Sequence, residues 1–194
     1  MAPELNINPA KTAVVVIDLQ KGIAQMPTQP YSSEVVISNT ANLLNIARQK
    51  GINIFLIRVT RSPDLKDALK PISESTFQRN QFDPSWSEYV PQLNIQSTDF
   101  LITKHQWGAF YGTELDLQLR RRGIDTIILC GISTNFGVES TARFAYEFGY
   151  NQIFVEDAMS ARSKEEHDAS VKNIFPRLGL VRSAEEVIQS LNNK

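Results

Sequence analysis

The stretch ILCGISTNFGVESTARFAYEFG, residues 128–149, decides the fold class of this chain of 194 residues. It begins with a continuous apolar run, which is typical of a strand buried on both faces of a parallel sheet. A turn with two glycines follows, and then a helical segment that ends at Gly149, a residue type that often closes a helix. Such a turn lies at the carboxyl end of the strand, where open parallel sheets bind their ligands. We therefore expect reactive groups in this turn.

Similar apolar runs recur along the chain, and helical segments separate them. The runs span residues 12–18, 52–59, 99–104, 124–130 and 151–157, with a weaker one at 179–183. Three residues have the spacing of a capping box at a helix start: Thr113, Ser163 and Ser183. Alternating strands and helices predict right-handed crossovers and an α/β fold. We expect a three-layer α/β/α sandwich with a six-stranded, mainly parallel, Rossmann-like sheet, in a single domain over residues 1–194.

Composition and charge argue against several classes of function. The chain has 20 Lys and Arg against 21 Asp and Glu, so its net charge gives no sign of a nucleic-acid or polyanionic partner. One cysteine excludes an internal disulfide, and the apolar runs are too short to span a bilayer. No signal-peptide pattern opens the sequence. We expect a cytoplasmic protein that binds small molecules or further copies of itself.

Polar residues that end apolar runs are the candidates for a functional site. They are Asp18, Arg58, Lys104, the turn 131–137 and Asp157. Because the carboxyl ends of parallel strands meet at one edge of the sheet, Asp18 and Lys104 are expected to enter one partly desolvated pocket. Either residue alone would equally suit a charge turned into solvent. Their convergence with the glycine-containing turn favours a functional site.

Four segments resemble one family, in the order and spacing of that family. They are TAVVVIDLQ (12–20), ITKHQWGAFYGTEL (102–115), CGISTNFGVESTARFAYEFGY (130–150) and VEDAMSA (155–161). They resemble the isochorismatase-like hydrolase superfamily, which includes nicotinamidases, N-carbamoyl amidohydrolases and isochorismatases. The resemblance implies a sheet order of 3-2-1-4-5-6 and catalysis by an Asp, a Lys and a Cys. Asp18 matches the Asp and Lys104 the Lys, whereas Gly137 stands at the Cys position.

The missing cysteine at position 137 changes the expected chemistry. Glycine cannot attack a carbonyl, so the resemblance implies the branch with Gly at this position, as in isochorismatases, and no covalent intermediate. In that branch an acid protonates a vinyl ether, water adds, and the hemiketal collapses to pyruvate and an alcohol. Asp18 would be the general acid, which needs a pKa raised by burial, whereas a nearby Lys104 opposes that shift. We expect no metal and no other cofactor.

Residues around the turn are the expected substrate contacts. Backbone amides of residues 131–137 lie at the positive end of the next helix, where an anion is favoured. The predicted contacts are Trp107, Phe110, Tyr111, Ile132, Ser133, Thr134 and Asn135. Packing of the loop against the core would equally explain the three aromatic residues. The resemblance also implies a cis peptide near Ile132–Ser133 and a dimer or tetramer, in which an aromatic-rich loop within residues 60–98 helps to close a neighbour's pocket.

Other interpretations of these residues stay open. Ser133, Asp157 and His167 follow the order of a serine-hydrolase triad, but the second glycine of the elbow is absent and His167 lies in an acidic turn typical of a solvated cap. Cys130 ends a buried run, which favours core packing over a nucleophilic role. True isochorismatases tend to have Tyr-Ala-His at positions 133–135. The sequence therefore also allows amide or imide hydrolysis with water activated by Asp18, or ligand binding without catalysis.

Overall fold

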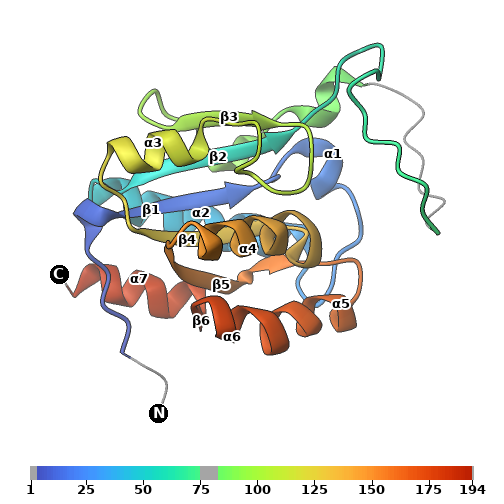
Figure 1. Ribbon diagram of the computed structural model, residues 1–194. Helices are drawn as coiled ribbons and strands as arrows, with labels where there is room; N and C mark the ends of the chain where they lie inside the picture. The colour runs from blue at the N-terminus through green and yellow to red at the C-terminus, as the bar shows by residue number, and fades with distance from the viewer. Residues whose placement is uncertain (1–3, 75–82, 194) are drawn as a thin grey trace.

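The computed structural model describes residues 4–74 and 83–193, which form a three-layer α/β/α arrangement around one parallel sheet (Figure 1). The strands are β1 (Thr12–Ile17), β2 (Asn53–Val59), β3 (Phe100–Lys104), β4 (Thr126–Ile132), β5 (Asn151–Ser160) and β6 (Leu180–Arg182). Their order in the sheet is β3-β2-β1-β4-β5-β6, and every neighbouring pair is parallel. The predicted fold class and sheet order are confirmed.

Helices cover both faces of the sheet. One face carries α2 (Ser33–Gln49) and α7 (Ala184–Asn192), and the other carries α3 (Leu115–Arg121), α4 (Glu139–Glu147) and α6 (Phe175–Leu178). The short helices are α1 (Lys21–Ala24), α5 (Lys164–Ala169), η1 (Pro9–Lys11), η2 (Pro84–Ser87), η3 (Pro91–Leu93), η4 (Thr134–Val138) and η5 (Ser170–Ile174). Within the described residues, none of these helices has the length and apolar character needed to cross a membrane.

The central strand β1 explains why the apolar runs are continuous. All six of its residues are buried. Val14 and Val16 belong to the core under α2 and α7, whereas Val15 and Ile17 belong to the core under α3 and α4. Each fully buried Val or Ile side chain contributes about 1.5–3 kcal/mol to folding. Because the side chains of β1 pack into two hydrophobic cores, the strand has no position for an exposed polar side chain before it ends.

An irregularity between β4 and β5 shapes the carboxyl end of the sheet. The register shifts between Leu129 and Gly131, and Gly131 pairs with Met159. Gly131 has a φ of +123°, and a Cβ at this residue would lie 2.0 Å from the backbone oxygen of Ile17. Glycine alone permits this close approach of β4 to β1. Both β4 and β5 extend beyond their predicted ends.

Because β5 is longer than predicted, Asp157 lies inside the strand instead of at its end. Its Oδ1 accepts a hydrogen bond of 2.7 Å from the backbone N–H of Ala184, the first residue of α7. Burial raises the pKa of Asp157. The side chain therefore stabilises the start of a helix, and it does not join Ser133 and His167 in a triad.

Two of the three predicted helix caps are confirmed. The hydroxyl of Ser163 accepts the backbone N–H of Glu166, and Ser183 forms a complete capping box with Glu186. The prediction for Thr113 is wrong, because α3 begins one residue later, with Glu114 at its N-cap. The Thr113 hydroxyl accepts the backbone N–H of Leu115, the first residue of α3, at 3.2 Å, and donates to the carbonyl of Ala109 at 2.5 Å.

The long loop after β2 is attached to the end of β1. The amide of Gln20 bonds to both backbone groups of Val59 and to the carbonyl of Trp86, at 2.9–3.2 Å. Tyr89 donates its hydroxyl to the carbonyl of Leu56 at 2.8 Å. These bonds hold residues 83–90 beside the carboxyl end of β1. Phe77 and Phe82, which we expected to contribute to the aromatic-rich loop, lie outside the described residues.

Candidate active site

Asp18 directly follows β1 at the carboxyl end of the sheet. Its φ of +53° lies in the left-handed region, which non-glycine residues seldom adopt. Residues with this strained backbone cluster at functional sites. The backbone N–H of Asp18 still donates to the carbonyl of Ile57 in β2, at 2.9 Å. The side chain is only 6% exposed. A carboxylate in such a position is a candidate for chemistry.

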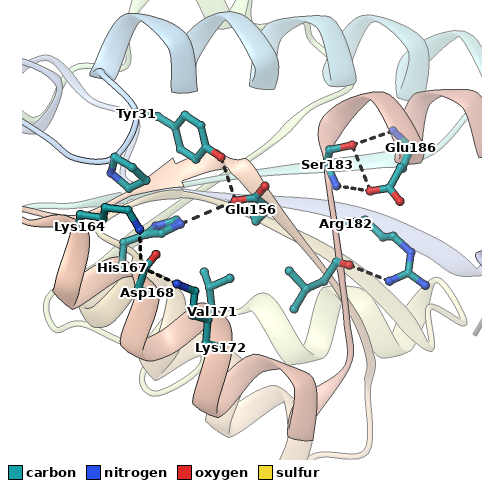
Figure 2. Close-up of a pocket in the computed structure, with 12 residues that line it drawn as sticks. Tyr31, Glu156, Lys164, His167, Asp168, Val171, Lys172, Arg182, Ser183 and Glu186 are labelled. Carbon is teal, nitrogen blue, oxygen red and sulfur yellow. Dashed lines mark hydrogen bonds and ion pairs between the residues drawn. The ribbon is translucent and has the colours of Figure 1, made fainter. Parts of the chain in front are cut away.

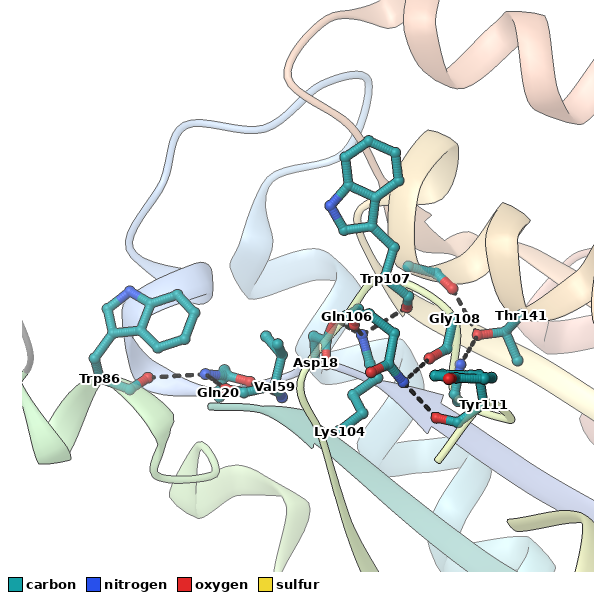
Figure 3. Close-up of polar contacts among 12 residues, drawn as sticks. Asp18, Gln20, Val59, Trp86, Lys104, Gln106, Trp107, Gly108, Tyr111 and Thr141 are labelled. Atoms are coloured by element: carbon teal, nitrogen blue, oxygen red, sulfur yellow. Dashed lines mark hydrogen bonds and ion pairs between the residues drawn. The ribbon is translucent and has the colours of Figure 1, made fainter. Parts of the chain in front are cut away.

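Lys104, the last residue of β3, forms a buried ion pair with Asp18 (Figure 3). Its Nζ lies 2.8 Å from Asp18 Oδ2, 3.0 Å from the carbonyl oxygen of Gln106 and 2.7 Å from that of Trp107. An ammonium has three hydrogens, and these three acceptors account for all of them. The side chain is 1% exposed. A ligand could therefore accept a hydrogen bond from Lys104 only by displacing one of these partners.

The pairing with Lys104 decides the charge on Asp18 in the unliganded protein. Burial alone favours the neutral carboxyl, whereas an ammonium in contact favours the carboxylate. Two carbonyl acceptors hold the Lys104 Nζ in this contact. The contact with Lys104 therefore favours the carboxylate form of Asp18. The same bonds fix the loop that carries Trp107, so the ion pair also organises the surrounding backbone.

Position 137, in η4, faces the Asp18–Lys104 ion pair. A Cβ built on Gly137 would lie 2.8 Å from Ile17 Cγ2, 3.0 Å from Asp18 Oδ2 and 3.7 Å from Lys104 Nζ. The absence of a side chain lets η4 approach the carboxylate this closely. Three separate segments, which end β1, end β3 and follow β4, thus meet at one point. They bring together a carboxylate and an ammonium, and position 137 adds no nucleophile.

The sequence pattern described as the isochorismatase domain matches residues 12–186, a range that includes all three segments. The chain belongs to the isochorismatase family of hydrolases. This isochorismatase-family hydrolase is 48% identical over 193 residues to the uncharacterized isochorismatase family protein YwoC of Bacillus subtilis (strain 168). The match covers 98% of this chain and 100% of YwoC. A solved isochorismatase family structure from Burkholderia thailandensis has a TM-score of 0.93 at 44% identity, and covers 96% of this chain and 98% of that one.

More distant relatives have names that state different activities. The hydrolase is 26% identical over 189 residues to a probable isochorismatase of Pseudomonas chlororaphis, covering 94% of this chain and 87% of the relative. It is 28% identical over 177 residues to the ureidoacrylate amidohydrolase RutB of Agrobacterium fabrum, covering 79% and 78%. These likenesses establish the family and do not identify the substrate.

The turn after β4 has the expected backbone. The peptide bond between Ile132 and Ser133 is cis, as predicted. The carbonyl of Ser133 accepts the backbone N–H groups of Phe136 and Val138, both at 3.2 Å. Asn135 Oδ1 is buried and has no hydrogen-bond partner among the described residues of the hydrolase. These bonds make the turn a fixed feature of the site.

The three aromatic residues that were predicted to wall the pocket lie in different surroundings. Trp107 is 62% exposed, and its ring centroid lies 4.9 Å from that of Phe136 in the turn. Phe110 is buried in the core under α3 and α4, where it contacts Phe148 and Tyr150. Tyr111 is 74% exposed. Phe110 thus follows the alternative of loop-to-core packing, and only Trp107 adjoins both Lys104 and the turn.

Cys130 and His105 lie outside the ion pair. Cys130 is fully buried, and burial raises the pKa of its thiol to about 12, as suits the predicted core residue. His105 is half exposed and lies 3.1 Å from the carbonyl of Thr60. In the part of the chain that the structure describes, no group of three or more His, Cys, Asp or Glu residues could hold a metal ion.

The prediction of a solvated His167 is wrong. Its ring is 1% exposed, and Nδ1 lies 2.9 Å from the hydroxyl of Thr134 in the turn. The acidic residues around His167 concealed this burial. His167 and Ser170 are three residues apart and both are buried, but nothing in the sequence distinguishes this helical face from an exposed one.

Proposed function

We propose that this hydrolase cleaves a vinyl ether in a small cyclic or anionic metabolite, without a covalent intermediate. Asp18 is the general acid in this proposal, Lys104 is its electrostatic partner, and Gly137 marks the branch that lacks the family's cysteine. One observation supports it above all: a buried Asp18–Lys104 pair faces a position with no side chain. We further propose a single domain over residues 1–194 that forms a dimer or tetramer.

The proposed reaction is a sequence of proton transfers. The Asp18 carboxyl donates its proton to the methylene carbon of the vinyl ether, and the C–O carbon becomes an oxocarbenium-like centre. Water adds to that carbon and returns one proton to the Asp18 carboxylate. The resulting hemiketal then collapses to a ketone and an alcohol, so that one water is consumed for each ether bond broken. No atom of the protein becomes covalently bonded to the substrate.

Lys104 stabilises the deprotonated form of Asp18 more than the protonated form. Lys104 favours the carboxylate that remains after Asp18 has donated its proton, which lowers the barrier to the donation. Asp18 must first gain that proton. A negatively charged substrate group nearby would partly cancel the field of the ammonium and favour protonation in the complex. This requirement is why we propose an anionic substrate.

The proposed substrate contacts lie on the turn and on Trp107. Backbone amides of residues 131–137 would hold an anionic group, with Ile132, Ser133 and Thr134 contributing through the main chain. Asn135 has a buried Oδ1 without a partner in the described residues, which suits acceptance of a substrate hydroxyl. The ring of Trp107 would cover a flat substrate. Phe110 and Tyr111 are left out of this set because of their placement.

A second candidate is hydrolysis of an amide or imide, and the charge on Asp18 favours it. A resting carboxylate is already in the form of a general base, which could take a proton from water as the water attacks a carbonyl. The likeness to a ureidoacrylate amidohydrolase supports the same class of reaction. This candidate predicts release of ammonia or an amine, and no pyruvate.

The products decide between these candidates. Purified protein would be incubated with isochorismate, with pyruvate followed by a coupled assay, and with a panel of amides and imides, with ammonia followed. If the proposal holds, pyruvate forms and Asp18→Asn lowers its rate by about 10²–10⁴-fold. Unchanged pyruvate release by Asp18→Asn would contradict the role of Asp18. Ammonia without pyruvate would favour amide hydrolysis, and thermal stabilisation by a ligand without turnover would favour a binding protein.

A further inference from the structure

A buried histidine supports the active-site turn from the side opposite Asp18. His167 of α5 lies 2.9 Å, through Nδ1, from the hydroxyl of Thr134, and neither residue has more than 1% of its surface exposed. Thr134 is the first residue of η4, the short helix that carries Gly137. The His167–Thr134 contact therefore joins α5 to the segment that faces the Asp18–Lys104 pair.

The second ring nitrogen of His167 faces an acidic residue (Figure 2). Nε2 lies 3.9 Å from Glu156 Oε2, too far for a hydrogen bond but close enough for charge attraction. The hydroxyl of Tyr31 donates to the same oxygen at 3.0 Å, and its ring meets that of His167 edge-on, with centroids 5.9 Å apart. The three side chains come from the loop before α2, from β5 and from α5.

This acidic partner favours one tautomer of His167. The imidazole of His167 and the phenol of Tyr31 lower the pKa of Glu156 against the opposing effect of burial, so Glu156 is a carboxylate. Of the two neutral tautomers of the ring, a carboxylate opposite Nε2 favours the one with its proton on Nε2. Nδ1 is then an acceptor, and the Thr134 hydroxyl must be the donor. The direction of the Thr134 hydrogen bond is thus determined by residues outside the turn.

A second contact from the same helical segment supports the next part of the turn. The hydroxyl of Ser170 donates to Glu139 Oε2 at 2.5 Å, and Glu139 is the first residue of α4. From the other side, the hydroxyl of Thr141 donates to the carbonyl of Gly137 at 2.7 Å and accepts the N–H of Ala109 at 3.1 Å. The segment between β4 and α4 is thus held from both sides by buried hydrogen bonds.

We propose that His167 is a positioning residue, which through Thr134 sets where position 137 lies relative to the Asp18–Lys104 pair. Glu156 and Tyr31 in turn fix the tautomer of His167. These three residues line a groove of about 510 Å³, together with the charged residues Lys164, Asp168, Lys172, Arg182 and Glu186. His167 acts on catalysis only through the turn, and this part of the inference depends on the proposed function.

Two substitutions separate the contacts of the two ring nitrogens. Asn places its amide where Nδ1 lies, and Gln places its amide near Nε2, so His167→Asn keeps the contact with Thr134 whereas His167→Gln loses it. We expect Thr134→Val and His167→Gln to lower kcat about tenfold, with a smaller change in KM, and His167→Asn to retain most of the activity. Thr40→Val is the matched control, because Thr40 is equally buried and its hydroxyl bonds to the carbonyl of Val36 and to Cys130 Sγ, and not to His167.

NMR tests the tautomer without any substrate. The chain has two histidines, of which His105 is half exposed and His167 is buried. The ¹⁵N shifts of His167 should show a neutral ring with its proton on Nε2, and the Nδ1 signal should move in Thr134→Val but not in Thr40→Val. A ring of the opposite tautomer, or one that ignores Thr134→Val, would overturn the proposal even in an active enzyme.

A thiol at position 137 reports the position of the turn if isochorismate is not a substrate. In Gly137→Cys, the new thiol should react with iodoacetamide at a rate set by its closeness to Lys104. Adding His167→Gln should change this rate, whereas adding His167→Asn should not. Absence of pyruvate together with this pattern would contradict only the proposed function. Equal rates in both double variants would overturn the positioning role of His167.

Discussion

Two buried polar clusters lie on opposite sides of one turn, and they differ in how strongly their members are bound. In the first cluster, the Lys104 ammonium bonds to the Asp18 carboxylate and to two backbone carbonyls, all within 3.0 Å. In the second, His167 makes one short contact with Thr134, and its other nitrogen lies 3.9 Å from Glu156. In the first cluster all three hydrogens of the ammonium are bonded, whereas the second joins an imidazole ring to a carboxylate that partly reaches solvent.

This difference suggests that the two clusters have different roles in the site. The Lys104 ammonium has no hydrogen left for a ligand, so its contribution is to favour the Asp18 carboxylate and to hold the loop that carries Trp107. The second cluster, whose contacts are weaker, supports the turn on the side opposite Asp18. If this division is correct, disruption of the first cluster affects both folding and catalysis, whereas disruption of the second mainly affects catalysis.

The largest effect is expected from breaking the ion pair on one side only. Lys104→Met leaves the Asp18 carboxylate buried without its ammonium, which should reduce the free energy of unfolding by about 3–5 kcal/mol. Asp18→Asn together with Lys104→Met removes both charges and should recover part of that loss. Urea denaturation of the two single variants and the double variant measures the coupling. Strictly additive losses would show that the two charges do not stabilise one another.

A smaller effect is expected from adding a side chain at position 137. In Gly137→Ala the new Cβ would lie 2.8 Å from Ile17 Cγ2 and 3.0 Å from Asp18 Oδ2, so a neighbour must move by a few tenths of an ångström. Crowding of this kind typically costs about 1–3 kcal/mol, and the shift of Asp18 should also reduce activity. Thermal unfolding and the pyruvate assay measure the two losses. Full stability and activity would mean that the turn lies farther from Asp18 than described.

Gly137→Cys sharpens the same comparison because Cys130 provides an internal reference. A thiol beside the Asp18–Lys104 pair has a carboxylate that can take its proton and an ammonium that can stabilise the thiolate, so it should react readily with iodoacetamide near neutral pH. Cys130 is fully buried with its pKa raised to about 12, and it should react only when the chain unfolds. Mass spectrometry of peptides locates the label. Labelling of Cys130 before the new thiol would contradict the placement of position 137.

The sequence predicts the first cluster and not the second, and the reason lies in how each is assembled. Asp18 and Lys104 end apolar runs, and a parallel sheet brings all such ends to one edge, so their meeting follows from the fold class alone. His167 meets Thr134, Glu156 and Tyr31 through the packing of α5 against the sheet, which no run or spacing specifies. The same limit applies to Phe110, which shares a loop with Trp107 but turns into the core.

Tyr31→Phe tests whether the second cluster holds its histidine in one state. Burial and the neighbouring Glu156 carboxylate raise the pKa of Tyr31 to about 12, so its hydroxyl is a donor throughout the neutral range. Its removal takes one hydrogen bond from Glu156 and should cost about 1 kcal/mol of stability. The ¹⁵N shifts of His167 should respond, while the reaction of iodoacetamide with Gly137→Cys should stay nearly unchanged. A large change in that reaction would mean that Tyr31 affects the position of the turn more directly than Thr134 does.

The smallest effect is expected in the acid limb of the stability profile. His167 and Tyr31 lower the pKa of Glu156 below its ordinary value of 4.5, so the unfolded chain binds the proton more readily than the folded chain. The resulting stabilisation is fully present above pH 4.5 and is lost as the pH falls through the pKa in the folded protein. Glu156→Gln should therefore flatten part of the loss of stability below this pH. Urea midpoints between neutral pH and the acid limit measure this difference, with Glu185→Gln on the exposed start of α7 as the control. An unchanged acid limb in Glu156→Gln would mean that the carboxylate interacts no more strongly in the folded chain than in the unfolded one, which would contradict its proposed effect on the tautomer of His167.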